Sequence, residues 1–185
     1  MTAAEALSGG PEGELRHLAE SALNEDRARD DVTTAALVSE EQGGRAVIVA
    51  KAPGVLAGLP MAEAVFSVAD GSLVWRPHRR DGDRLSAGDG VATVEGSLAA
   101  ILRGERVALN YLSHLSGVAT ATAAVVVALQ GTDCRLRDTR KTVPGLRSLE
   151  KYAVRMGGGT NHRLNLADGV LIKDNHLAAL RARGL

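Results

Sequence analysis

The sequence is poor in cysteine and in aromatic residues. Its 185 residues include one Cys, one Trp, one Phe and two Tyr. A single cysteine, Cys134, cannot form an internal disulfide, and so few aromatic rings leave little surface for stacking nucleic-acid bases. These absences argue against a disulfide-stabilised secreted domain and against a protein that binds single-stranded nucleic acid.

Net charge and long apolar runs are also lacking. The chain carries 22 basic and 22 acidic side chains, with 45% apolar residues. Balanced charge gives no overall field that would attract nucleic acid or an anionic membrane. The sequence shows no signal peptide and no stretch of about 18 apolar residues, the length that a membrane span needs. We therefore expect a globular cytoplasmic protein with neither nucleic acid nor a membrane as partner.

Helical and strand patterns alternate in the first part of the chain. Pro11 and Pro60 stand where two helices would begin, a position that proline favours. Gly and Asp residues at 81–90 indicate turns. The patterns predict helices at 11–24 and 61–69 and strands at 45–50, 72–76 and 90–96. This order predicts an open α/β sandwich.

A long apolar stretch follows, from Leu98 to about Leu129. Apolar residues fall on most sides of a helical pattern, which is typical of buried helices. Gly104 and Gly117 interrupt the pattern, so we expect two helices that join a first domain to a second. We place the domain boundary near residue 130, giving domains at 1–130 and 131–185.

The second region also alternates strand and helix patterns. Strands are expected at 134–138 and 169–173, and helices at 146–156 and from 177 onward. Such alternation predicts parallel βα units, whose ligand sites lie at the carboxyl ends of the strands. Cys134, without a matching His and acid pair, is expected to be a small core residue.

Basic residues concentrate between positions 138 and 176, and this pattern indicates a site for anions. Arginine binds carboxylates and phosphates with two parallel hydrogen bonds, whereas lysine acts as a point charge. A solvated basic surface is the plainer explanation of the same residues. The candidate ligands are Arg140, Lys141, His162, Arg163 and Lys173.

Two further features allow more than one interpretation. Residues Gly157, Gly158 and Gly159 form either a loop whose backbone approaches a ligand closely or a plain turn. Arg106 lies inside an apolar helical pattern, where a charge is costly unless it is paired. Glu105 is one candidate partner for it.

Five motifs resemble those of the quinolinate phosphoribosyltransferases, and they occur in the order of that family. They cover the chain from about residue 12 to 176, far more than a single short pattern would. The motifs are DDVTT at 30–34, GERVALNYLSHLSGVAT at 104–120, DTRKTVPGLR at 138–147, LEKYAVRMGGGTNHR at 149–163 and LADGVLIKDNH at 166–176.

The resemblance implies a fold, a reaction and a set of site residues. The fold would be an N-terminal α/β sandwich followed by an α/β barrel. The reaction would transfer a phosphoribosyl group from phosphoribosyl pyrophosphate to quinolinate and release CO2, giving nicotinate mononucleotide for NAD synthesis. Lys141 would be catalytic, and a homodimer would share its sites through Arg106. The implied substrate-binding residues are Arg106, Thr139, Arg140, Lys141, His162, Arg163 and Lys173.

The sequence departs from the family in one respect. A βα unit takes roughly 30 residues and a complete barrel about 250, so the 55 residues after position 130 hold about two units. We expect an incomplete barrel without the acidic residues that hold Mg2+ in the family. No metal ligand is nominated. The alternatives are a non-catalytic remnant that binds anions or dimerises, and a related enzyme acting on another substrate, such as a nicotinate phosphoribosyltransferase.

Overall fold

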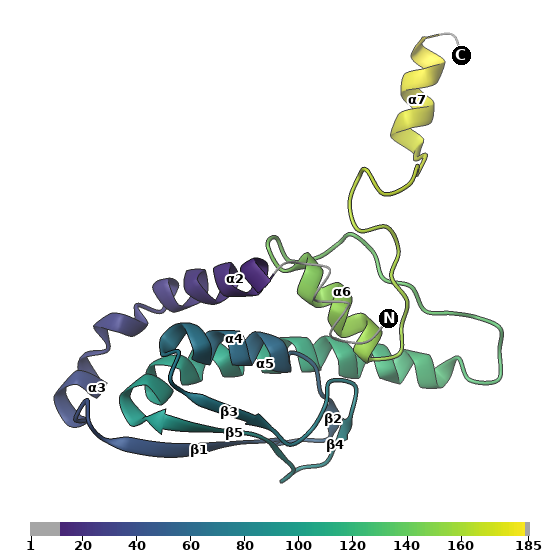
Figure 1. The fold of residues 1–185 in the computed structure, drawn as a ribbon. Helices are drawn as coiled ribbons and strands as arrows, with labels where there is room; N and C mark the ends of the chain where they lie inside the picture. Colours follow the sequence, from purple (N-terminus) through teal and green to yellow (C-terminus); the bar gives the residue numbers. More distant parts are fainter. Residues whose placement is uncertain (1–11, 184–185) are drawn as a thin grey trace.

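The computed structural model describes residues 12–183, and its first half is an α/β sandwich (Figure 1). The main sheet is antiparallel, with strand order β1-β5-β3. Its strands are β1 (Gly43–Val49), β5 (Gly90–Ser97) and β3 (Val74–Pro77). The predicted sandwich and its strands are confirmed, with small shifts at the strand ends. The sequence patterns missed a second, two-stranded sheet of β2 (Gly54–Val55) and β4 (Arg84–Leu85).

Helices cover one face of the main sheet (Figure 1). The predicted helix starting near Pro60 is confirmed, with that proline in its first turn. Pro11, the other expected helix start, lies outside the described residues. The helices are α2 (Glu12–Glu25), α3 (Val32–Leu37), α4 (Leu59–Ala69), α5 (Leu98–Ala128), α6 (Arg147–Met156) and α7 (Asp174–Ala182), with a 3-10 turn η1 (Ala28–Asp30).

The hydrophobic core lies between the sheet and helices α4 and α5. Residues alternate in burial along β1, as expected when one face of a sheet packs on a core. Val94 of β5, Val65 of α4 and Ile101 of α5 are almost fully buried there. Phe66 stacks on Trp75 with ring centroids 5.7 Å apart, which ties α4 to β3. The few aromatic residues are thus used mainly in packing.

Helix α5 is one continuous helix of 31 residues, so the prediction of two helices divided at Gly104 and Gly117 is wrong. Glycine inside a helix costs only about 1 kcal/mol relative to alanine, and packing offsets that cost here. A Cβ atom at Gly104 would lie 3.1 Å from the Phe66 ring. The glycine therefore lets α4 approach α5 closely and does not interrupt the helix.

By length and composition alone, α5 could cross a membrane, with a mean hydropathy of 1.4 over its most apolar 18 residues. A core helix of a soluble protein has the same properties. One side of α5 packs on the sheet and on α4, and its next turns contact α6. In this fold 22% of that apolar stretch is buried, so packing within the described residues accounts for only part of its apolar character.

The three consecutive glycines let α6 end against α5. A Cβ atom at Gly157 would collide with the Ala119 carbonyl oxygen, and one at Gly159 would lie 2.9 Å from the Thr122 side chain. Gly158 has a φ of +86°, a conformation that glycine adopts easily. The glycine run thus lets α6 pack closely against α5, a role that neither interpretation from the sequence included.

The strands predicted at 134–138 and 169–173 are absent, and this part of the prediction is wrong. Residues 134–138 form only an isolated parallel bridge, between Arg137 and Thr160. In residues 169–173 the apolar side chains are exposed, with Val170 93% accessible. A parallel strand needs neighbouring strands for its backbone hydrogen bonds, and the described residues supply none here. Cys134 is also exposed and not in the core.

Asp81 links the start of α4 to α6. Three of its hydrogen bonds go to α4 and one goes to α6. Its carboxylate accepts from the backbone N–H groups of Gly58 (2.9 Å) and Leu59 (3.2 and 3.3 Å), at the start of α4. The Tyr152 hydroxyl donates to the same carboxylate at 2.6 Å. Burial, and then the charge of Asp81, raise the pKa of Tyr152 well above its ordinary value. The phenol therefore stays protonated and keeps donating.

We predict that Tyr152→Phe lowers the free energy of unfolding by about 1.5–3 kcal/mol, the range for a hydrogen bond to a charged group. Thermal denaturation followed by circular dichroism measures the loss. Tyr111→Phe is the matched control, because Tyr111 donates to the Leu18 carbonyl over a long 3.4 Å and should lose less than about 1 kcal/mol. Equal losses in the two variants would contradict the role given to Asp81.

Candidate anion-binding site

A parallel backbone contact brings together two basic segments that are about twenty residues apart in the sequence. The Asp138 N–H donates to the Thr160 carbonyl at 3.0 Å, and the Thr160 N–H donates to the Leu136 carbonyl at 2.9 Å. The chain continues from this contact into residues 139–141 on one side and 162–163 on the other. We call these segments the two basic loops. They hold five of the seven predicted site residues.

A buried ion pair lies beneath the two basic loops. Lys151, on the inner face of α6, is 2% exposed. Its Nζ atom donates to Asp138 Oδ1 at 2.6 Å and to the His162 carbonyl at 3.0 Å. Asp138 also accepts from the His162 N–H at 2.7 Å and from Asn161 Nδ2 at 2.6 Å. Every polar atom of the pair thus has a partner, as a buried charge requires.

The first basic loop presents Arg140 and Lys141. The Lys141 N–H donates to the Thr139 hydroxyl at 3.0 Å, which makes a tight turn and gives Thr139 a structural role. Lys141 itself is exposed. Arg140 is half-buried, and its Nε atom is buried without a hydrogen-bond partner in the part of the chain that the structure describes. A buried donor without a partner is costly. Arg140 is therefore a candidate to donate a hydrogen bond to a bound anion.

The second basic loop presents His162 and Arg163, which are both half-buried. Arg163 Nη1 donates to the Gly169 carbonyl at 3.0 Å. The His162 backbone is held at both ends, because its N–H bonds to Asp138 and its carbonyl accepts from Lys151. Two fixed loops with several cationic groups can bind a ligand that carries two negative groups.

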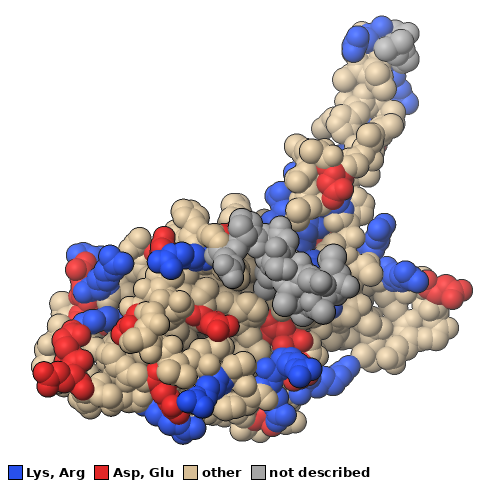
Figure 2. Space-filling model, in the orientation of Figure 1, with Lys and Arg blue, Asp and Glu red and all other residues tan. Residues whose placement is uncertain are grey.

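Lys173 and Arg106 form no hydrogen bond or ion pair with this cluster among residues 12–183. Lys173 is exposed on the segment that projects from the body, and its N–H donates to His176 Nδ1 at 2.9 Å. Arg106 is exposed on α5 and forms no ion pair with Glu105 within the described residues. Because its head group reaches solvent, Arg106 does not need the buried partner that the sequence pattern suggested. Figure 2 shows Lys and Arg side chains around the base of the projecting segment.

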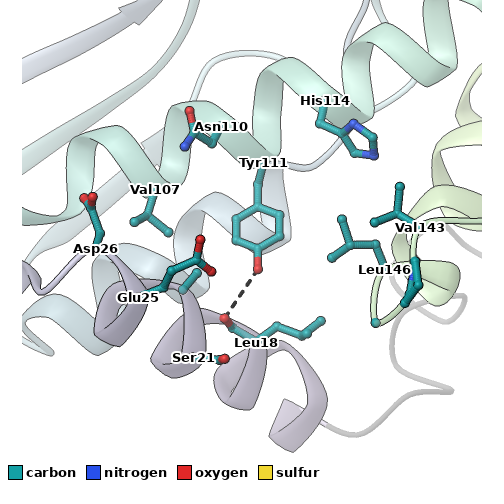
Figure 3. A pocket seen from close by; sticks show the side chains of 13 residues that line it. Leu18, Ser21, Glu25, Asp26, Val107, Asn110, Tyr111, His114, Val143 and Leu146 are labelled. Atoms are coloured by element: carbon teal, nitrogen blue, oxygen red, sulfur yellow. Dashed lines mark hydrogen bonds between the residues drawn. The ribbon is translucent and has the colours of Figure 1, made fainter.

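A pocket of about 570 Å³ lies next to this region, between α2, α5 and residues 143–146 (Figure 3). Glu25 and Asp26 line one end of it, and His114 lies toward the other. His114 Nε2 pairs with Glu150 Oε1 at 3.0 Å. The pocket lining includes no Lys or Arg and none of the predicted site residues. Its acidic and apolar walls do not suit a dianion, so the basic loops are the candidate anion site.

The Mg2+ ion implied by the resemblance finds no matching ligand set in the described residues. Residues 12–183 contain no group of three or more His, Cys, Asp or Glu side chains arranged to hold a metal ion. Asp138 is the carboxylate nearest to the basic loops, and it is already saturated by hydrogen bonds. We therefore derive no step through a metal.

Sequence reasoning missed the residues that hold the site in place. Asp138, Lys151 and Asn161 carry the network under the basic loops, yet none was nominated. One signal could have indicated Lys151, because it is a charged residue between Leu149 and Tyr152, on the buried face of a short helix. A buried lysine needs an anionic partner.

Two family models match the chain. The quinolinate phosphoribosyl transferase N-terminal domain matches residues 31–116, and the C-terminal domain of the same family matches residues 118–182. The two matches together include both sheets, α5 apart from Gly117, and both basic loops.

Curated relatives carry names from the same family. A probable nicotinate-nucleotide pyrophosphorylase (carboxylating) of Bacillus subtilis is 46% identical over 166 residues, which is 90% of this chain and 57% of the relative. The nicotinate-nucleotide pyrophosphorylase (carboxylating) of Mycobacterium leprae is 47% identical over 164 residues, or 86% of this chain and 57% of the relative. The chain thus spans little more than half the length of these relatives.

Solved structures agree in fold. NadC from Streptococcus pyogenes has a TM-score of 0.85 and 46% identity, covering 89% of this chain and 59% of that chain. The nicotinate-nucleotide pyrophosphorylase from Francisella tularensis has a TM-score of 0.86 and 34% identity, covering 91% and 60%. From the two family models, the curated relatives and these folds, the chain belongs to the quinolinate phosphoribosyltransferase family.

Proposed function

We propose that this chain binds quinolinate at the two basic loops and serves the transfer of a phosphoribosyl group to it. The observation that supports the proposal is the backbone pairing at Asp138 and Thr160, from which residues 139–141 and 162–163 both continue. Quinolinate has two adjacent carboxylates, and a pair of cationic loops matches that arrangement. The name of the two matching family models, quinolinate phosphoribosyl transferase, supports the same substrate.

The residues would act mainly by binding and orientation. Arg140 and Arg163 would hold the two carboxylates, so that the ring nitrogen faces the ribose of phosphoribosyl pyrophosphate. Lys141, exposed at the rim, would stabilise the negative charge that develops on the leaving pyrophosphate. The nitrogen becomes positively charged when the new bond to the ribose forms. The bond between C2 and its carboxylate then breaks to release CO2, its electron pair stays on C2 beside the positive nitrogen, and C2 takes a proton from water. This sequence needs no covalent nucleophile.

Arg106 and Lys173 would complete the site from outside the cluster. We propose that Arg106 reaches the basic loops of a second copy in a homodimer, since it is exposed on α5 and makes no hydrogen bond or ion pair with the loops of its own chain among the described residues. Lys173 would approach from the projecting segment. In this scheme residues 1–130 are the sandwich domain and residues 131–185 belong to the barrel domain of a soluble, cytoplasmic enzyme.

A second candidate function is anion binding without turnover. It is favoured by the absence of a metal-binding cluster among the described residues. The two functions are separated by incubating the chain with quinolinate, phosphoribosyl pyrophosphate and Mg2+ and following nicotinate mononucleotide by chromatography. Product formation supports the transferase. Binding of quinolinate with no product supports the second function, and turnover of nicotinate but not of quinolinate contradicts the proposed substrate.

We predict that Arg140→Ala weakens quinolinate binding about ten- to a hundred-fold. A hydrogen bond between charged groups contributes about 1.5–3 kcal/mol, and 1.4 kcal/mol corresponds to a factor of ten. Isothermal titration calorimetry measures the change. Arg137→Ala is the matched control, because Arg137 is exposed on the neighbouring stretch and should bind quinolinate as the parent does. Unchanged affinity in Arg140→Ala would remove this arginine from the site.

The shared-site proposal predicts complementation between two defective variants. Arg106→Ala and Arg140→Ala should each lose quinolinate sites, because every site of either homodimer carries a lesion. After mixing and random re-association, half of the dimers combine the two variants, and each has one intact site. Calorimetry should then find about a quarter of the parent's sites. If the mixture regains no quinolinate sites, although mass spectrometry shows that subunits exchange, Arg106 belongs to the site of its own chain.

A further inference from the structure

The ion pair between Lys151 and Asp138 is enclosed by protein. The Lys151 side chain is 3% exposed and the Asp138 side chain 7%. Removing two charges from water costs several kcal/mol per ion, and a pair of apolar residues of similar volume is often as stable or more stable. Global stability alone therefore does not explain why a lysine occupies this position on α6.

The contacts of the pair indicate another role. Asp138 directly precedes the first basic loop, and it accepts from the backbone N–H of His162 in the second loop. Lys151 donates to both sides of the junction, at the Asp138 carboxylate and at the His162 carbonyl. Lys151 thus joins α6 to Asp138, which precedes the first basic loop, and to His162 in the second. Just beyond the loops, Arg147 of α6 donates to the Thr142 hydroxyl at 3.1 Å and to the Leu164 carbonyl at 3.5 Å.

Asn161 extends the network on the same side. Its Nδ2 atom donates to Asp138 Oδ2 and to the Lys151 carbonyl, at 2.6 and 2.9 Å. Its Oδ1 atom accepts from Arg155. The segment that leads into the second basic loop is therefore held by the same carboxylate and the same helix. A shift of Asp138 would move both loops.

We propose that Lys151 is a positioning residue, which fixes the spacing of the two basic loops so that each can bind one carboxylate of a pyridine dicarboxylate. The inference rests on the proposed function for the identity of the ligand. Beyond that function, the inference names Lys151 as a residue that determines which anions the site prefers. A correctly spaced pair of loops favours a dianion over a monoanion, because only the dianion uses both loops. A misplacement of about 1 Å in such a site is enough for a large loss.

The test uses Asp138→Asn combined with Lys151→Met in the full chain. This double variant removes both charges, keeps similar volumes and leaves an oxygen that can accept from the His162 N–H. The single variant Lys151→Met would leave a buried unpaired carboxylate and risks unfolding, so it is not the primary test. Lys51→Met is the matched control, since Lys51 is exposed in the sandwich.

Calorimetry should show that the double variant binds quinolinate about tenfold more weakly or worse, while its affinity for nicotinate, which has one carboxylate, changes little. The ratio of the two affinities is the decisive readout. A purely structural role would lower both affinities by the same factor, through a smaller folded fraction, and would overturn the proposal. Unchanged affinity for both ligands would overturn it as well.

Amide hydrogen exchange tests the positioning independently of the ligand. The amides of residues 138–142 and 160–163 should exchange faster in the double variant than in the parent, and those of α5 at the same rate. This result is expected even if the parent does not bind quinolinate and the proposed function is wrong. Exchange at the parent's rate in both segments would mean that the loops keep their places without the ion pair, and the proposal would fail.

Discussion

The packing of the long helix α5 is the constraint on which the rest of this structure depends. Its first half supplies the core that the sheet and α4 cover, and its later turns receive the end of α6. The contact with α6 is close because Gly157 and Gly159 have no side chain to collide with Ala119 and Thr122. The position of α6 in turn places Lys151 under the basic loops. The sandwich and the anion site are therefore parts of one packed arrangement.

Charge is used differently at the surface and beneath the site. Most ion pairs of the described residues are exposed, such as Arg45 with Glu95 and Arg16 with Glu20, and such pairs contribute little to stability. The pair of Lys151 with Asp138 is enclosed and fully hydrogen-bonded. Beside it, Arg140 retains a buried Nε atom without a partner among the described residues. In the proposed site, a saturated ion pair therefore lies beside an arginine whose Nε atom has no partner among the described residues.

The projecting segment, residues 164–183, contrasts with this packed region (Figure 1). Leu166, Val170 and Ile172 are exposed there, although the sequence alternation is typical of a buried parallel strand followed by a helix. The match to the family's C-terminal domain runs through this segment, while the chain covers under two thirds of the relatives' length. The strand pattern is therefore present in the sequence without neighbours to pair with in the described residues.

The sequence by itself determined the sandwich, most helices and the types of residue at the site, because these follow from local periodicity, proline positions and motifs such as DTRKT. Only the tertiary structure decided that α5 is unbroken, because the cost of Gly104 is offset by contact with Phe66. It also decided that Cys134 is exposed and that Asp138, Lys151 and Asn161 support the basic loops. A hydrogen-bond network between segments twenty residues apart leaves no local pattern, since it depends on which side chains meet after the helices have packed.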